Sequence, residues 1–197
     1  NDMFFFIKKI IIIYICQITI IYIMKDYILK CGLIVGFIQV TMLFLSYFFG
    51  IDLMLSTWWG VSQFMISLLL VVYFGIQIRK AKNNVLSFKD SFKVSFGIYA
   101  CAGFILTFFN ILLYNFIDVE FATIAKEKII ESTYQMMQDF GASDDVIDDA
   151  IIEIEKQDSF SISTLAKGYF FGLPLYIIIS LIISAFIKKN PIQDTTD

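Results

Sequence analysis

Four aspartates form the densest group of chemically active side chains in this sequence: Asp144, Asp145, Asp148 and Asp149. On a helix their spacing makes two i, i+4 carboxylate pairs, which repel each other unless a counterion lies between them. Calcium sites need about six to eight oxygen ligands and usually a glycine-containing loop, which the stretch DDVIDD does not provide. We therefore interpret the four aspartates as a solvated acidic face and predict no metal site.

Neutral polar side chains lie inside long apolar stretches. Gln39, Gln63, Asn110 and Asn115 all occur where no Asp, Glu, Lys or Arg is present. Amides at such positions can line a path for a solute, or they can hydrogen-bond to a neighbouring helix. Proton-coupled carriers and ion pumps usually carry ionisable groups at that depth, and none is found here. We predict that Asn110 and Asn115 serve helix packing.

The sequence lacks the residues of the familiar catalytic centres. Histidine is absent and the three cysteines lie in apolar surroundings without a Cys-x-x-Cys spacing. No phosphate-binding glycine loop, nucleophile elbow or zinc-protease motif is present. A net charge of −3 without a basic stripe also argues against a nucleic-acid partner. We predict no catalytic residues, no cofactor and no enzymatic activity.

Composition favours lipid as the solvent of this chain. Apolar residues make up 58% of it and charged residues 17%. Four stretches of at least twenty residues carry no charge, namely residues 31–51, 53–78, 94–117 and 168–187. About twenty apolar residues in a helix cross the hydrocarbon layer. We predict an all-α integral membrane protein with four helices, spanning about residues 28–50, 55–78, 94–117 and 166–187, within one domain of residues 24–190.

Small residues predict how the four helices meet. Gly32 and Gly36 lie in the first span, and Gly168 and Gly172 in the fourth, at intervals of four. Small side chains let helix backbones approach closely. We expect spans one and four to pack through these faces, and a dimer interface is the competing use.

Residues 118–164, between spans three and four, carry twelve acids and three lysines. Apolar residues recur at helical spacing from Ala122 to Phe140, and Gly141 can end that helix in a left-handed conformation. Ser143 can cap a second helix with an apolar stripe that begins at Ile147. The segment therefore predicts an acidic helical hairpin.

Charge asymmetry predicts the orientation. The loop between spans two and three contains five Lys or Arg residues and one Asp, and lysines also precede span one and follow span four. Excess Lys and Arg in short loops marks the cytoplasmic side. We predict a bacterial cytoplasmic membrane protein with both termini inside, a cytoplasmic tail at residues 191–197 and the acidic hairpin outside.

Residues 1–23 use few residue types and precede Met24, which opens a good span. One interpretation is a non-native extension before a start at Met24. The rival interpretations are a signal anchor with the apolar run 10–23, or a signal peptide without a small-residue cleavage site. If the extension is native, a fifth span becomes possible.

Several stretches resemble the bacterial membrane family known as domain-of-unknown-function family 4199. They are MKDYILKCGLIVGF from Met24, LSFKDSFKVSFGI at the entry to span three, NILLYNFIDVEF at its exit, and AFIKKN at the end of span four. The resemblance covers about residues 24–190. Val119 stands where the family often has proline. The resemblance implies the four-span topology and supplies no catalytic or binding residues.

Three functions stay open at this point. The leading one is a non-enzymatic envelope interaction or assembly protein, whose outer hairpin contacts a protein partner or a second copy. The alternative is a small channel or transporter subunit, with Gln39, Gln63, Asn110 and Asn115 along a path between helices. The third is an intramembrane enzyme that uses an outer carboxylate such as Asp118 or Glu120.

Overall fold

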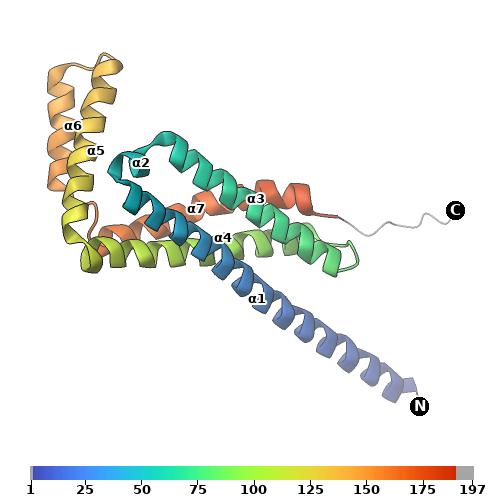
Figure 1. Ribbon diagram of the computed structural model, residues 1–197. Coiled ribbons are helices and arrows are strands. Elements are labelled where there is room, and N and C mark those ends of the chain that lie inside the picture. The colour runs from blue at the N-terminus through green and yellow to red at the C-terminus, as the bar shows by residue number, and fades with distance from the viewer. Residues whose placement is uncertain (1, 190–197) are drawn as a thin grey trace.

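The computed structural model describes the backbone of residues 2–189 and the side chains of residues 24–189. The predictions about residues 1–23 and the tail at 191–197 lie outside the residues described in full. The helices, in chain order, are α1 (Asp2–Phe49), α2 (Ile51–Leu55), α3 (Thr57–Ala81), α4 (Phe88–Leu112), the π-helical turn η1 (Leu113–Ile117), α5 (Val119–Asp139), α6 (Asp144–Lys156) and α7 (Ile162–Ile187) (Figure 1).

Four helical segments are long and apolar enough to cross a membrane: Met24–Phe49, Thr57–Ala81, Phe88–Ile117 and Ile162–Ile187. The all-helical prediction is confirmed, and the described residues contain no β-strand beyond the single bridge between Leu86 and Lys189. The third segment starts six residues before the predicted span at residue 94. The helix extends further because Ser87 caps it, with its hydroxyl accepting a hydrogen bond from the Asp90 amide at 3.1 Å.

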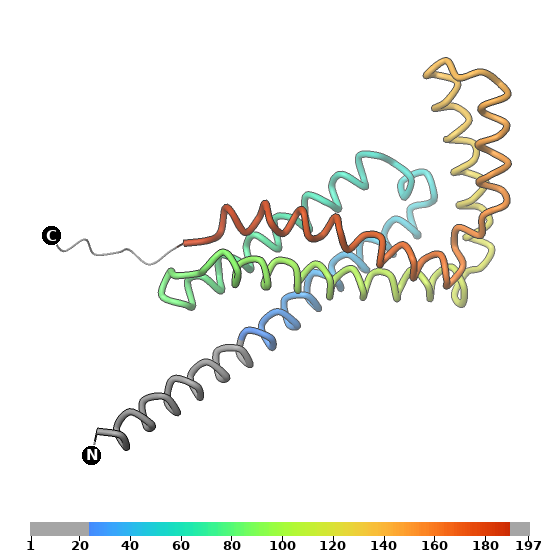
Figure 2. Tube along the Cα trace, turned by 180° about the vertical axis from the view of Figure 1, so that it is seen from behind, coloured from blue at the N-terminus to red at the C-terminus, as the bar shows by residue number. Residues whose placement is uncertain are grey.

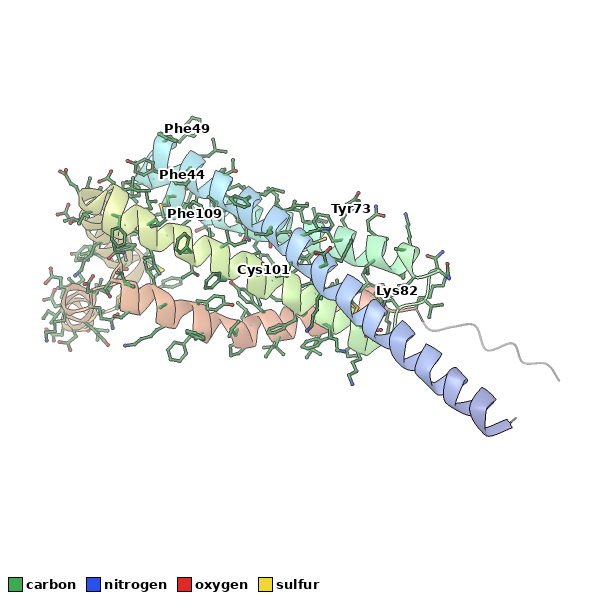
Figure 3. The ribbon with its side chains drawn as sticks, turned by 90° about the horizontal axis from the view of Figure 1, so that it is seen from below. Phe44, Phe49, Tyr73, Lys82, Cys101 and Phe109 are labelled. Carbon is green, nitrogen blue, oxygen red and sulfur yellow. The ribbon has the colours of Figure 1, made fainter. Side chains whose placement is uncertain are left out.

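Helix α4 is the central element of the bundle. It lies between α1 and α7, as the view from below shows (Figure 3). Val94, Ile98 and Ala102 are almost fully buried, and Ser91 and Ser95 are buried beside them. Small side chains on α4 allow both neighbours to approach its backbone closely.

Glycines set the closest helix contacts, but not between the helices that the sequence suggested. A Cβ at Gly32 would lie 2.6 Å from the Cys101 Cβ, and one at Gly36 would lie 2.8 Å from Ile105 Cδ1, so both glycines face α4. Gly168 and Gly172 have no atom within 4 Å of a built Cβ. The prediction that spans one and four pack through glycine faces is therefore wrong, because α4 lies between them.

Basic residues gather at one end of the bundle. The Arg79 guanidinium donates to the Ile187 carbonyl at 3.2 Å, and Leu86 and Lys189 exchange backbone hydrogen bonds of 2.9 Å. Lys82 lies 3.6 Å from the Asp90 carboxylate. These contacts hold the α3–α4 loop beside the end of α7.

At the opposite end, α5 and α6 lie side by side and run across the bundle instead of continuing its direction. Figures 1 and 2 show the pair from two opposite sides, and Figure 3 shows it nearly end-on. The helices α5 and α6 pack against each other, and Ile147 of α6 is 1% exposed. The helix α5 also contacts α2. The helices α5 and α6 and the turn between them, residues 119–156, together form an arm that projects from the bundle.

We predict that Gly32→Val destabilises the bundle by about 1–3 kcal/mol, because the added methyl groups collide with Cys101 and force α1 away from α4. Gly172→Val is the matched control, since its position on α7 is open. Thermal unfolding of both variants in detergent, followed by circular dichroism, measures the difference. An equal loss in the two variants would contradict the assigned packing.

Candidate functional site

Asp118 connects the bundle to the arm. It stands between η1 and α5, and its carboxylate Oδ1 accepts a hydrogen bond from the Phe121 amide at 2.9 Å, which caps the start of α5. The other oxygen, Oδ2, accepts from the Tyr47 hydroxyl at 2.8 Å. One side chain therefore begins α5 and fixes it to the end of α1.

Aromatic rings surround this carboxylate. The Phe121 ring packs edge-on against Tyr47, with 4.9 Å between ring centroids, and stacks on Tyr114 at 6.0 Å. Tyr114 also contacts Phe160 in the segment before α7, at 4.4 Å. Tyr114 and Phe121 are buried. The cluster joins α1, η1, α5 and the start of α7 in one apolar contact region.

The π-helical turn places a second polar link here. In η1 the Asp118 amide donates to the Leu113 carbonyl at 2.9 Å, which widens the last turn before the chain changes direction. Asn115 donates to the Phe160 carbonyl at 3.0 Å and to Ile111 within its own helix. Asn115 thus ties the end of span three to the segment that leads into span four.

Lys128 provides a further attachment of the arm. Its amine lies 2.8 Å from the Glu131 carboxylate and 3.3 Å from that of Asp52 in the loop that contains α2. The hydrogen bonds to Glu131 and Asp52 raise the pKa of Lys128 above its ordinary value. Within the arm, Lys126 donates to the Glu155 carbonyl at 2.7 Å and joins α5 to the end of α6.

The arm presents acids along α6 and apolar side chains at its tip. Asp144, Asp145, Asp148 and Asp149 are all exposed on α6. Gly141 adopts a φ of +75° after α5, as its position in the sequence suggested. Three apolar side chains beside this turn are largely exposed, namely Met136 at 53%, Phe140 at 86% and Val146 at 53%.

The exposure of Met136 and Phe140 differs from the expectation that they continue the buried stripe of the first arm helix. The helix α6 has 13 residues and α5 has 21. The buried contacts of α5 concentrate near its base, at Phe121 and Ala125. The tip therefore keeps an apolar surface that the chain itself does not cover.

The aspartates of α6 do not come together with other ligands. In the part of the chain with described side chains, no group of three or more Asp, Glu, His or Cys residues is placed to hold a metal ion.

The four membrane amides divide between two places. Gln39 and Gln63 line one cavity of about 230 Å³ among α1, α3, α4 and α7. Asn110 donates to the Leu106 carbonyl of its own helix at 2.9 Å. Asn115 belongs to the arm junction, the name used here for Asp118, Asn115 and the aromatic cluster at the base of the arm. The lining of this cavity therefore includes two of the four amides of the predicted path, and the two asparagine amides bond to backbone carbonyls.

The family comparison now identifies the chain. The family described as "Protein of unknown function (DUF4199)" matches residues 30–189. The chain belongs to this family. The segment NILLYNFIDVEF, on which the resemblance to DUF4199 rested, is the arm junction itself, since it contains Tyr114, Asn115, Asp118 and Phe121.

No curated protein and no solved structure matches this DUF4199 chain. Its function must therefore be inferred from its own geometry. Sequence reasoning gave Asp118 only a role as a possible enzyme carboxylate and did not assign Tyr47 or Phe160 to the junction. Their only signal in the sequence was an aromatic side chain close to the end of a predicted span.

We predict that Asp118→Ala releases the arm, because it removes the α5 cap, worth about 0.5–2 kcal/mol, together with the Tyr47 bond. Spin labels at Ser143→Cys on the arm and Lys167→Cys on α7, in a background without native cysteines, report one narrow distance distribution in the parent protein. Asp118→Ala should broaden it. Asp139→Ala, at the far end of α5, is the matched control and should leave the distribution narrow.

Proposed function

We propose that this protein is a non-enzymatic interaction or assembly protein of the bacterial inner membrane, and that its arm is the contact surface. One observation carries the proposal: the arm is fixed at its base by Asp118 yet exposes Met136, Phe140 and Val146 at its tip. A rigid projection with an uncovered apolar end suits recognition of another protein, because little conformational entropy is lost on binding.

The arm forms the acidic hairpin on the outer face of the membrane in this proposal. Support comes from the basic residues of the α3–α4 loop and from Lys188 and Lys189, which share the other end of the bundle. Excess Lys and Arg belongs on the cytoplasmic side. Both termini then lie in the cytoplasm.

The chemistry of the partner follows from the charge of the arm. Residues 119–156 carry ten acids and three lysines, a net charge of −7. Anionic headgroups repel such a surface, which disfavours docking on lipid. A partner with basic side chains around an apolar pocket complements both the α6 acids and the tip. That partner is a protein, or a second copy with its own basic surface.

A small channel or transporter subunit is the second candidate, and the cavity that contains Gln39 and Gln63 favours it. In that case purified protein in liposomes carries a neutral solute, and Gln63→Leu lowers the flux. A scaffold tolerates this substitution and fails when the arm is deleted.

We predict the orientation by labelling intact cells with an impermeant maleimide. Ser143→Cys, which is exposed at the tip of the arm, should react from outside. Lys89→Cys, at an exposed position near the start of α4, should react only after the membrane is opened. This position is more suitable than Asn83 in the α3–α4 loop, because the φ of +54° at Asn83 disfavours replacement by cysteine. Reversed labelling would overturn the proposed topology.

We predict that a photoreactive residue at Phe140 captures a specific protein in native membranes, whereas the same residue at Lys89 does not. Asp148→Lys combined with Asp149→Lys should reduce capture at least several-fold, because it removes acidic complementarity. Mass spectrometry of the crosslinked product gives its mass and identifies the peptides of the captured protein. Capture of lipid alone, or of nothing, would contradict the proposed function.

A further inference from the structure

The cavity between α3 and the rest of the bundle is lined by several hydrogen-bonding side chains. The helix α3 is held at the basic end, where Ile187 of α7 packs on Gly75 and accepts from Arg79. Toward α2 it diverges from α7, as Figures 1 and 2 both show. The cavity of about 230 Å³ lies in this region.

Two hydroxyl groups in the cavity wall are buried and unpaired. Ser67 is 3% exposed and Tyr99 is 5% exposed. Their hydroxyls lie close to each other, and neither makes a hydrogen bond of standard geometry to another described residue. Both residues line the cavity, together with the amides of Gln39 and Gln63. An unpaired hydroxyl away from water costs free energy, so this arrangement is suited to a ligand that supplies the missing partners.

An aromatic wall gives the cavity a fixed shape. The rings of Tyr99 and Tyr176 stack with 5.7 Å between their centroids and 16° between their planes. Gly103 permits this arrangement, because a Cβ at that position would lie 2.8 Å from the Tyr176 hydroxyl. The polar wall is therefore positioned before any ligand arrives.

The lining restricts the charge of the ligand. None of the residues that line the cavity in the described part of the chain carries a formal charge. An ion at this depth in the bundle would have no counter-charge and a large desolvation cost. The cavity is also smaller than the roughly 300–1,000 Å³ of drug-sized pockets, so it holds one compact group.

The cavity is bordered by apolar side chains that are exposed on the surface of the bundle. Phe64 on α3 and Leu175 on α7 line it and are 45% and 56% exposed. Gly60, also in the lining, is exposed and adds no side chain to close the opening. A ligand can therefore place its polar group among the hydroxyls and amides while its hydrocarbon chain stays in the bilayer.

We infer that this cavity binds the uncharged, oxygen-bearing headgroup of a membrane amphiphile, through Ser67, Tyr99, Gln39 and Gln63. Two kinds of amphiphile share that chemistry: a glycerol ester with a free hydroxyl, and a lipid quinone with ring carbonyls. In both, the ligand oxygens accept from the Ser67 and Tyr99 hydroxyls, and the glutamine amides bind the remaining groups. The inference is independent of the proposed role of the arm.

Binding is tested with the full chain in nanodiscs of phosphatidylcholine, titrated with dioctanoylglycerol or with decylubiquinone. Thermal unfolding and native mass spectrometry report the complex. We expect one of the two probes to bind with one copy per chain, which identifies the source of the headgroup. Binding of neither probe overturns the inference.

Variants separate ligand binding from a structural role. Ser67→Ala combined with Tyr99→Phe should weaken probe binding tenfold or more. It should leave the melting temperature of the empty protein unchanged or higher, because the double variant removes both hydroxyls at once and neither makes a standard hydrogen bond to another described residue. Gln63→Leu should also weaken binding. Gln77→Leu, the same change on the same helix outside the cavity lining, should not. Undiminished binding by the double variant, or a lower melting temperature without ligand, contradicts the assignment.

Discussion

The Asp118 carboxylate accepts one hydrogen bond from the backbone of α5 and another from the side chain of Tyr47 on α1. This double contact fixes the start of α5 relative to α1, and the direction of the arm follows from it. The Asn115 bond to Phe160 and the Lys128 ion pair with Asp52 hold the arm in the same direction. The Tyr114, Phe121 and Phe160 rings pack beside this contact, and the hydrogen bond from Tyr47 is of the stronger kind because its acceptor is charged.

Packing around α4 obeys a different constraint. Lipid chains are as apolar as leucine, so helices in a membrane gain little from hiding apolar surface and depend on close contact of backbones. Gly32 and Gly36 on α1, and Gly103 on α4, supply that closeness. Large apolar side chains point outward instead, as Phe104 and Phe186 do with 61% and 79% of their surface exposed. The bundle therefore combines close helix contacts at its glycines with large apolar side chains on its outer surface.

The contrast between α3 and the other long helices separates the two functional proposals in space. The contacts that fix the arm lie at the end of the bundle where α1, η1 and the segment before α7 meet. The cavity lies where α3 diverges from α7. Tyr99 on α4 lines the cavity, and further along the same helix its last turn leads through η1 to Asp118. A change in the tilt of α4 would be felt at both places, since one continuous helical segment joins them.

The sequence by itself determined the number of long apolar helices, because length and absence of charge decide whether a helix can cross a membrane. It also determined the two arm helices, through Gly141 and the apolar spacing around it, and the clustering of basic residues in the loops. These are local properties of the chain. Membership of the family likewise rests on local stretches of residues.

The tertiary structure alone decided which faces meet. A glycine indicates that another helix packs closely, but it does not indicate which helix. The structure shows that Gly32 faces Cys101 of α4, which lies between α1 and α7. The pairing of Tyr47 with Asp118 joins residues 71 positions apart, and no spacing rule predicts it. The same holds for Ser67 and Tyr99, whose hydroxyls share a cavity because α3 and α4 are oriented by contacts elsewhere. Helix formation is dictated by nearby residues, whereas helix packing depends on complementary shapes that are distant in the chain.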